Sequence, residues 1–239
     1  CEYRGTPFWS WNCKLDKDLL EMQIDCLKEM GLGGFHMHSR TGMATRYLSS
    51  EFMELVKTCV DKAEKENMLA WLYDEDRWPS GAAGGLLTKD PRYRMRKLNF
   101  TQKEMEHCVA KETAIKTGEP YYVACYDVAL NENGELLNYA QIEPGSEPEG
   151  EKWFAYCLTN ETSPWFNNQT YADTLSKEAI ERFIAITYDA YKEAVGDRFG
   201  SIIPAIFTDE PQFQKKTTLD YATSKQEVTL PWTHDVAET

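Results

Sequence analysis

The sequence predicts an α/β fold of the (β/α)8 barrel type, of which only the first four β/α units are present, with a small β-rich insertion. Apolar runs of strand length alternate with amphipathic helical segments at intervals of roughly 30–35 residues, as in parallel α/β folds. Acidic clusters directly follow two of these runs, at 74–76 and 209–210. Residues 92–165 break the rhythm with aromatic, strand-like sequence. Together these features favour a barrel that carries an insertion on one loop.

The first two units follow from local signals. A short strand is expected at 7–12 and a second one at 33–38. Between them, Asp16 offers a side-chain cap for a helix whose apolar residues repeat at helical spacing, and Gly31 suits its C-terminal end. Ser49 should cap the next helix, whose apolar face matches the 3.6-residue period.

The remaining units are less regular. A third strand is expected at 68–73, and a helix capped by Ser176 leads to a fourth strand at 202–207. The predicted domain organisation is therefore 1–91 for barrel units one to three, 92–165 for the insertion, and 166–239 for the continuation to strand four and its loop. Four units leave an open sheet edge, so a C-terminal remainder of a longer protein or an oligomeric partner is expected to cover it.

Composition excludes two classes of partner. The 239 residues carry a formal net charge of −13, and an acidic chain lacks the clustered Lys and Arg that phosphate contacts need, so no nucleic acid is expected. No apolar stretch approaches the roughly 20 residues of a membrane helix, so no membrane is expected. Seven cysteines without a CxxC pattern favour free thiols over a disulfide framework. Localisation stays unknown: free thiols favour the cytoplasm, and secretion remains open.

Glu210 is the first candidate catalytic residue. It follows the apolar run 202–207 and has Asp209 beside it. Partial burial and a neighbouring negative charge both favour a protonated carboxyl, as a general acid requires. The alternative is a carboxylate that caps the following loop.

The second acidic cluster is Asp74, Glu75 and Asp76. Strand alternation places Asp74 and Asp76 on one side and Glu75 on the other. We expect Glu75 to be the second catalytic carboxylate and the two aspartates to bind sugar hydroxyls, because glycosidic bond cleavage uses paired carboxylates. The alternative is an ion pair with Arg77 or Arg40.

His36 and His38 form an HxH pattern at the end of the second predicted strand. Metal-dependent hydrolases on barrels use such a pair as ligands. The other two histidines lie outside the predicted barrel strands, so no metal is assigned, and His38 and Arg40 are instead expected to bind the substrate. Three further residues complete the predicted sugar site, because aromatic faces stack on pyranose rings and polar groups line the rim: Trp9, Asn12 and Trp78. For Trp9, core packing is an equal alternative.

Four segments resemble large bacterial glycoside hydrolases related to the family 106 α-L-rhamnosidases. They are Pro-Phe-Trp-Ser-Trp-Asn at 7–12, 31–40, Trp-Leu-Tyr-Asp-Glu-Asp-Arg-Trp-Pro-Ser-Gly at 71–81, and Phe-Thr-Asp-Glu-Pro at 207–211. The resemblance implies a catalytic β/α barrel with further domains, and it places Glu210 at the position of the acid in many barrel glycosidases. Enzymes of that family are inverting and calcium-assisted; no calcium ligand is assigned in this chain.

These observations predict a bacterial glycoside hydrolase that acts on a carbohydrate substrate by carboxylate general acid/base catalysis and needs no cofactor. Two alternatives remain: a non-catalytic carbohydrate-binding protein, and a metal-dependent hydrolase that uses His36 and His38. The sugar, its anomer and the retaining or inverting outcome are not readable from the sequence.

Overall fold

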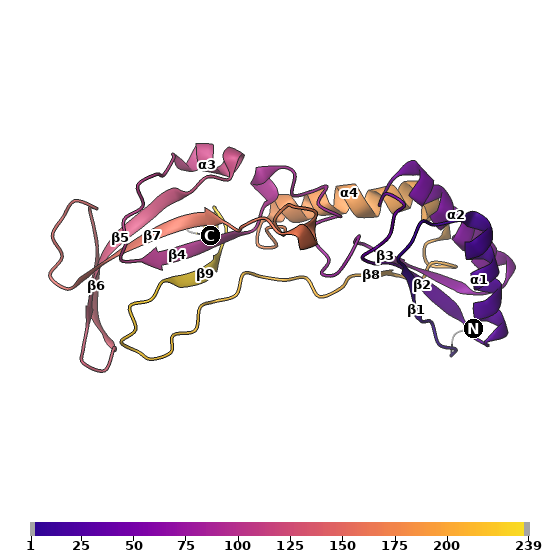
Figure 1. The fold of residues 1–239 in the computed structure, drawn as a ribbon, viewed down its shortest axis with the longest axis horizontal. Helices are drawn as coiled ribbons and strands as arrows, with labels where there is room; N and C mark the ends of the chain where they lie inside the picture. The colour runs from indigo at the N-terminus through magenta and orange to yellow at the C-terminus, as the bar shows by residue number, and fades with distance from the viewer. Residues whose placement is uncertain (1–2, 237–239) are drawn as a thin grey trace. The chain divides into compact units, whose positions relative to one another are not determined.

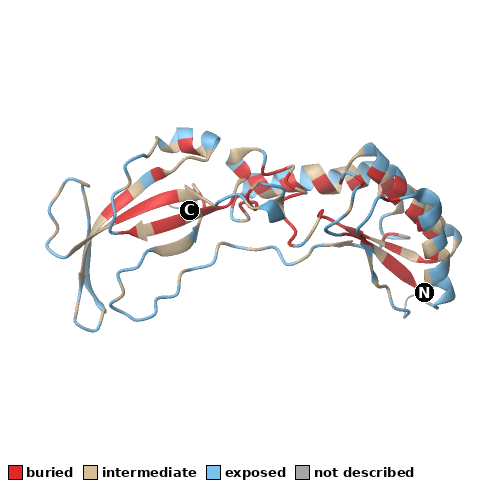
Figure 2. Cartoon of the chain, in the orientation of Figure 1, coloured by how far each residue is buried: buried red, intermediate tan, exposed pale blue. Residues whose placement is uncertain are grey.

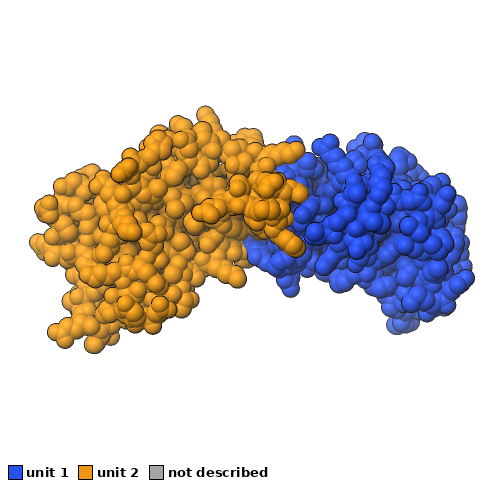
Figure 3. All heavy atoms as spheres, in the orientation of Figure 1, with its two compact units in different colours: residues 1–87, 180–212 blue, residues 88–179, 213–239 orange. Residues whose placement is uncertain are grey.

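A computed structural model describes residues 3–236. The chain forms two compact units, shown in separate colours in Figure 3. Unit 1 comprises 1–87 and 180–212, and unit 2 comprises 88–179 and 213–239. Unit 1 carries all of the predicted site residues. No helix in the described part of the chain is long and apolar enough to cross a membrane.

Unit 1 is built on a four-stranded parallel sheet in the order β1-β2-β3-β8. Its strands, labelled in Figure 1, are β1 (Phe8–Trp11), β2 (Gly34–Ser39), β3 (Leu69–Tyr73) and β8 (Ile206–Phe207). The strands run in one direction, so their carboxyl ends, where the acidic clusters follow β3 and β8, share one edge. The positions predicted for the first three strands are confirmed to within two residues at each end.

The helices of unit 1 begin where the sequence predicts. Helix α1 (Lys17–Glu29) is capped by Asp16, whose carboxylate accepts from Leu19 N at 3.0 Å. Helix α2 (Ser50–Lys65) is capped by Ser49, whose hydroxyl accepts from Phe52 N at 3.2 Å. Such caps satisfy backbone N–H groups that have no partner within the helix.

One face of the parallel sheet is covered by helices. Ile24 from α1, Val60 from α2 and Phe35 from β2 are fully buried in a common core. Figure 2 shows this core as red segments on the helices and strands of unit 1. The long helix α4 (Lys177–Val195) contributes Tyr191 and Val195 to the same core. Burial of these large apolar side chains stabilises the sheet–helix arrangement.

The fourth predicted strand is much shorter than expected. The sequence suggests 202–207, but only Ile206 and Phe207 form β8. The segment before them still lies along β3, since Ala70 N donates to Ile202 O at 2.9 Å and Leu72 N to Ala205 O at 3.3 Å. Pro204 has no N–H to give to a ladder, which interrupts regular strand structure there. Within residues 3–236 the parallel sheet does not close, so the barrel stays a prediction and the observed fold is mixed α/β.

Unit 2 is built on a five-stranded antiparallel sheet in the order β6-β5-β7-β4-β9. Its strands are β4 (Arg96–Thr101), β5 (Tyr121–Leu130), β6 (Leu136–Ile142), β7 (Glu151–Thr159) and β9 (Val228–Trp232). A short helix, α3 (Lys111–Thr117), precedes β5 and ends at Gly118 with a left-handed φ of 81°. Single 3-10 turns lie at Pro91–Tyr93 and Pro164–Phe166 in this unit and at Gly196–Arg198 in unit 1.

The antiparallel unit draws on more of the chain than the predicted insertion at 92–165. The segment after β8, expected to be a barrel loop, instead returns to this sheet, where β9 pairs with β4 in the register Leu98↔Leu230. Residues 166–179 also belong to unit 2, because Asp173 N donates to Tyr93 O at 2.8 Å. Neither β4 nor β9 was predicted as a separate strand from the sequence.

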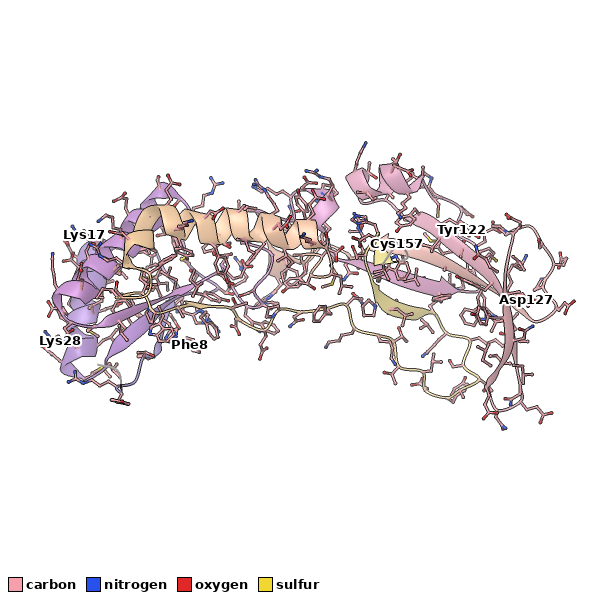
Figure 4. The ribbon with its side chains drawn as sticks, turned by 180° about the vertical axis from the view of Figure 1, so that it is seen from behind. Phe8, Lys17, Lys28, Tyr122, Asp127 and Cys157 are labelled. Carbon is pink, nitrogen blue, oxygen red and sulfur yellow. The ribbon has the colours of Figure 1, made fainter. Side chains whose placement is uncertain are left out.

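Loops of unit 2 are fixed by side chains. Asp127, labelled in Figure 4 near the end of β5, accepts from Glu149 N and Gly150 N, each at 2.8 Å. A side chain at Gly150 would come within 2.4 Å of Val128 O, so the close approach of the two strands requires glycine there. The six described cysteines are free thiols.

Candidate functional site

The acidic residues after β3 are all buried, and Asp74 lies at the centre of a hydroxyl network. Its Oδ1 accepts from Ser80 Oγ at 2.6 Å. Its Oδ2 accepts from Thr208 Oγ1 at 2.6 Å and from Tyr188 OH at 2.9 Å. Burial raises the pKa of Asp74, and the three hydroxyl donors oppose that shift. Asp74 thus joins β3, the loop after it, α4 and the end of β8, and its oxygens already accept from protein donors.

Glu75 is enclosed by the backbone of the loop that follows it. Its Oε2 accepts from the N–H groups of Gly81, Ala82 and Ala83 at 3.0, 2.8 and 2.7 Å. Its Oε1 accepts from Asp76 N at 2.8 Å and from Gly84 N. Consecutive N–H groups that converge in this way form a concave anion site of the nest type.

The catalytic role expected for Glu75 requires an accessible carboxylate, whereas this side chain is buried. The side chain is 1% exposed, so its carboxylate does not open to a cleft shared with Glu210. Burial raises the pKa of Glu75 to about 7, while the backbone donors act in the opposite direction. Gly84, with a φ of 62°, would place a Cβ 3.1 Å from the Asp76 side chain, so the loop's tight return also depends on glycine. Glu75 here organises the loop at 81–84.

Asp76 forms the ion pair that the sequence left open as an alternative. Its Oδ2 accepts from Arg77 Nε at 3.0 Å and from Nη2 at 2.8 Å. A planar guanidinium that donates two bonds to one carboxylate is a well-ordered arrangement. The pair lies at the edge of the same loop, with Asp76 8% exposed.

Glu210 is the exposed carboxylate of the cluster after β8. Its Oε2 accepts from Trp78 Nε1 at 3.0 Å, and Trp78 is 37% exposed. The backbone of Glu210 has a left-handed φ of 45°, a conformation that costs a non-glycine residue on the order of 1 kcal/mol or more. The sequence predicts partial burial for this side chain, and in the structure Glu210 is among the exposed residues.

The loops after β3 and β8 are tied together next to Glu210. Ser80 N donates to Asp209 O at 2.8 Å, and Asp209 N donates to Ser80 Oγ at 2.9 Å. Burial and the charge of Glu210 raise the pKa of Asp209, and the positive charge of Arg40 opposes that shift. Arg40 itself is exposed just past the end of β2. Asp209, Glu210, Trp78 and Arg40 therefore lie along one edge of the sheet.

His36 and His38 project from the face of the parallel sheet opposite the helices. His36 stacks on Trp71 with centroids 4.8 Å apart, and its Nδ1 lies 3.1 Å from Thr6 O. His38 is 2% exposed and packs edge-on against Tyr73 at 4.1 Å. Phe8, which Figure 4 labels, lies 4.8 Å from His38. Figure 4 also labels Lys17 and Lys28, which belong to α1 on the helical side.

The histidine environment favours neutral rings. Burial lowers the pKa of His38 to about 4, with smaller contributions from the charges of Arg40 and His36. Burial also lowers the pKa of His36. His38 Nδ1 is buried without a hydrogen-bond partner. The role predicted for His38, hydrogen bonding to a sugar hydroxyl, is untested; its present contacts are aromatic.

The described residues contain no group of three or more His, Cys, Asp or Glu side chains placed to hold a metal ion. Calcium prefers six to eight oxygen ligands. Asp74 and Glu75 do not fit that requirement, since their oxygens accept from hydroxyl and backbone N–H donors. The metal and cofactor predictions otherwise stay untested.

The remaining predicted site residues, Trp9 and Asn12, lie in different places on the parallel sheet. Trp9 points to the helical side of the sheet, where its Nε1 donates to Gln23 Oε1 at 2.9 Å and its ring packs against Phe35. That position corresponds to the core alternative. Asn12 is exposed directly after β1, at the same edge as Arg40. Tyr188 was not predicted as a site residue, although its hydroxyl donates to Asp74. Nothing in the sequence of the predicted helix marked it as a partner of that carboxylate.

Sequence comparison yields no family: no family model matches the chain, and no curated protein matches it either. Among solved structures, the chain resembles a rhamnosidase from Novosphingobium sp. PP1Y, with 17% identity and a TM-score of 0.35. The similarity covers 54% of this chain and 15% of that chain, so the chain spans a small part of that protein's length. The likeness to a glycosidase is distant, and the geometry of the site carries the functional argument.

Proposed function

We propose that the chain is part of a glycoside hydrolase that cleaves O-glycosyl bonds with Glu210 as general acid. The observation that carries the proposal is the exposed carboxylate of Glu210 at the carboxyl edge of a parallel sheet, which accepts a hydrogen bond of 3.0 Å from the partly exposed indole of Trp78. Catalytic groups of β/α folds are placed at this edge. A carboxyl beside an exposed aromatic ring suits a sugar, which needs a proton donor at its glycosidic oxygen and an apolar surface under its ring.

Backbone strain at Glu210 adds support. Left-handed conformations of residues other than glycine cluster at functional sites, where surrounding contacts hold them in place. Here the bonds between Ser80 and Asp209 fix the preceding residue on both its N–H and its C=O. The loop after β3 and the loop after β8 thus hold the Glu210 side chain in one position relative to Trp78.

The proposal gives the neighbouring groups distinct tasks. Arg40, Asp209 and Asn12 would bind substrate hydroxyls along the edge, and Trp78 would stack on a sugar ring. Glu75 would support the loop that carries Trp78 rather than act on the bond, because all five of its hydrogen bonds go to backbone N–H groups. The second catalytic carboxylate is not assigned.

The test compares Glu210→Gln with the unmodified protein on aryl glycosides, after a panel of nitrophenyl glycosides has identified a substrate. With a poor leaving group, kcat should fall at least about 10²-fold, the usual contribution of a general acid. With a dinitrophenyl leaving group, which departs without protonation, the loss should be much smaller. Glu193→Gln, an exposed glutamate on α4, is the control and should keep full activity. Equal losses on both substrates would rule out Glu210 as the acid.

One observation favours a second candidate, a carbohydrate-binding protein without catalysis. General acids of glycosidases are usually kept protonated by an apolar surrounding, whereas Glu210 is exposed. Calorimetric titration with oligosaccharides separates the two functions. Saturable binding without hydrolysis of any glycoside in the panel would favour the binding function over the enzyme.

A further inference from the structure

The antiparallel sheet of unit 2 has an apolar hollow on one face, with a volume of about 500 Å³. This volume falls within the range of roughly 300–1,000 Å³ that is typical of small-molecule sites. No lining residue carries a charge. The lining comprises Phe100, Tyr126, Val128, Leu130, Gly134, Leu136, Tyr139, Trp153, Leu219, Ala222, Ser224 and Val228.

A β-bulge brings the floor of the hollow together. Along β5, alternation puts Val128 and Leu130 on one face. On β6 the register shifts, so that Val128 pairs with Tyr139 but Leu130 pairs with Leu136. The extra residue, Leu137, lets Leu136 and Tyr139 share that face although they are three positions apart. The sequence pattern alone would have placed them on opposite faces.

Neighbouring strands extend the same surface. Trp153 on β7 is the partner of Tyr126 on β5. Phe100 on β4 is the partner of Val228 on β9, and the Phe100 ring lies 6.1 Å from the Tyr126 ring. Aromatic side chains from four strands therefore line one continuous surface, which is an arrangement suited to another ring.

The segment between β8 and β9 forms the wall of the hollow. Its base is fixed where Thr217 N donates to Thr229 O at 2.9 Å and Thr229 N donates to Thr217 Oγ1 at 2.8 Å. Its outer part approaches the β5–β6 turn so closely that a Cβ at Gly134 would lie 2.5 Å from Ala222 O. The wall is thus held at two points, and the hollow is a built feature of this unit.

We propose that this hollow binds an uncharged small molecule that contains an aromatic ring system. Leu136 and Tyr139 remain 58% and 64% exposed, and exposed apolar surface of this kind marks interaction sites. A sugar site would present carboxylate, amide or guanidinium groups for its hydroxyls. This lining offers only hydroxyl groups of Tyr126, Tyr139 and Ser224 and the Trp153 indole as side-chain polar groups. The inference is independent of the proposed hydrolase activity.

The probe for the test is N-phenyl-1-naphthylamine, an uncharged two-ring compound whose fluorescence rises in apolar surroundings. We expect saturable binding of one probe per chain. Leu136→Glu places a charge on the floor of the hollow and should weaken binding at least about tenfold, because it removes apolar contact and sets a charge beside an uncharged ligand. Leu137→Glu is the matched control, since this neighbouring leucine is 66% exposed and does not line the hollow. It should leave the affinity within about twofold.

A second pair of variants, in the segment that forms the wall, covers the case in which a strand variant misfolds. Far-UV circular dichroism would show such misfolding. Leu219→Glu should weaken binding, whereas Tyr221→Glu, on the same segment but outside the lining, should not. Unlabelled 2-naphthol should displace the probe, and oligosaccharides of glucose should not. The proposal is overturned if the unmodified protein shows no saturable binding. It is equally overturned if lining and control variants lose affinity alike, or if oligosaccharides displace the probe.

Discussion

Replacing Glu75 by Gln tests whether this carboxylate supports the loop after β3. Gln has nearly the same shape, but one of its two terminal atoms is an NH₂ group that cannot accept. Oε1 accepts from two backbone N–H groups and Oε2 from three. Either orientation of the amide therefore leaves at least two buried donors without an acceptor. At about 1–3 kcal/mol for each buried donor left without an acceptor, Glu75→Gln should lower the free energy of unfolding by at least about 2 kcal/mol.

The assay is urea unfolding at pH 5, where a pKa of about 7 keeps Glu75 protonated in the folded chain, combined with hydrogen exchange of the backbone amides at 81–84. These amides should lose protection in Glu75→Gln and stay protected in the control, Glu193→Gln. That glutamate is exposed on α4, so its replacement should change the stability by no more than about 0.5 kcal/mol. Unchanged protection at 81–84, together with a stability within about 1 kcal/mol of the unmodified protein, would refute the loop-anchor role.

The remaining predictions concern stability. Burial lowers the pKa of His38 to about 4, so between pH 6.5 and pH 4 the unfolded chain binds more protons and stability falls as the pH falls. His38→Phe should reduce this pH-dependent loss of unfolding free energy by an amount on the order of 2–3 kcal/mol. Urea unfolding midpoints of both proteins, compared across that pH range, measure the difference. A Cβ at Gly34 would lie 2.3 Å from Leu69 O, so Gly34→Ala should lower the thermal midpoint by several degrees or prevent folding. Gly145→Ala, where a Cβ meets nothing within 4 Å, should leave the midpoint unchanged.

The parallel half of the fold was predictable because its signals are local. Asp16 and Ser49 each stand one position before a helix, and their side chains accept the expected backbone N–H groups. The apolar period of α2 was read from the sequence and matches its buried residues. Caps and periodicity depend on neighbours within about one turn, so the sequence alone contains them.

Pairing over long distances was not predictable. Strand β9 contains Pro231 and reads as a loop, yet it pairs with β4 more than a hundred positions earlier. Proline is tolerated in an edge strand where its missing N–H is not needed, and β9 is at the edge of this sheet. Conversely, Pro204 shortened a segment whose apolar composition suggested a full strand. In both cases tertiary context, and not local propensity, decided the outcome.

In the candidate site, too, local features could be predicted from the sequence, whereas contacts between distant segments could not. The sequence drew attention to the two acidic clusters but could not distinguish the environments of their carboxylates. Asp74 and Glu75 follow a buried strand just as catalytic carboxylates do, yet each is occupied by donors from the loops around it. The glycine-rich sequence after Trp78 is the local signal for the enclosure of Glu75, because a run of small residues frees consecutive N–H groups to converge on one carboxylate.

The pH dependence of the stability difference between Glu75→Gln and the unmodified protein shows whether burial or hydrogen bonding has the larger effect on the pKa of Glu75. Burial raises its pKa to about 7, so between about pH 4.5 and pH 7 the folded chain binds more protons than the unfolded chain. The stabilisation that this difference in proton binding gives the folded chain is present in full below pH 4.5. It should decrease by about 3 kcal/mol as the pH rises to 7. Glu75→Gln should lack this slope. If the unmodified protein instead gains stability over this range relative to Glu75→Gln, the five backbone donors outweigh burial, and the loop holds an ionised carboxylate throughout.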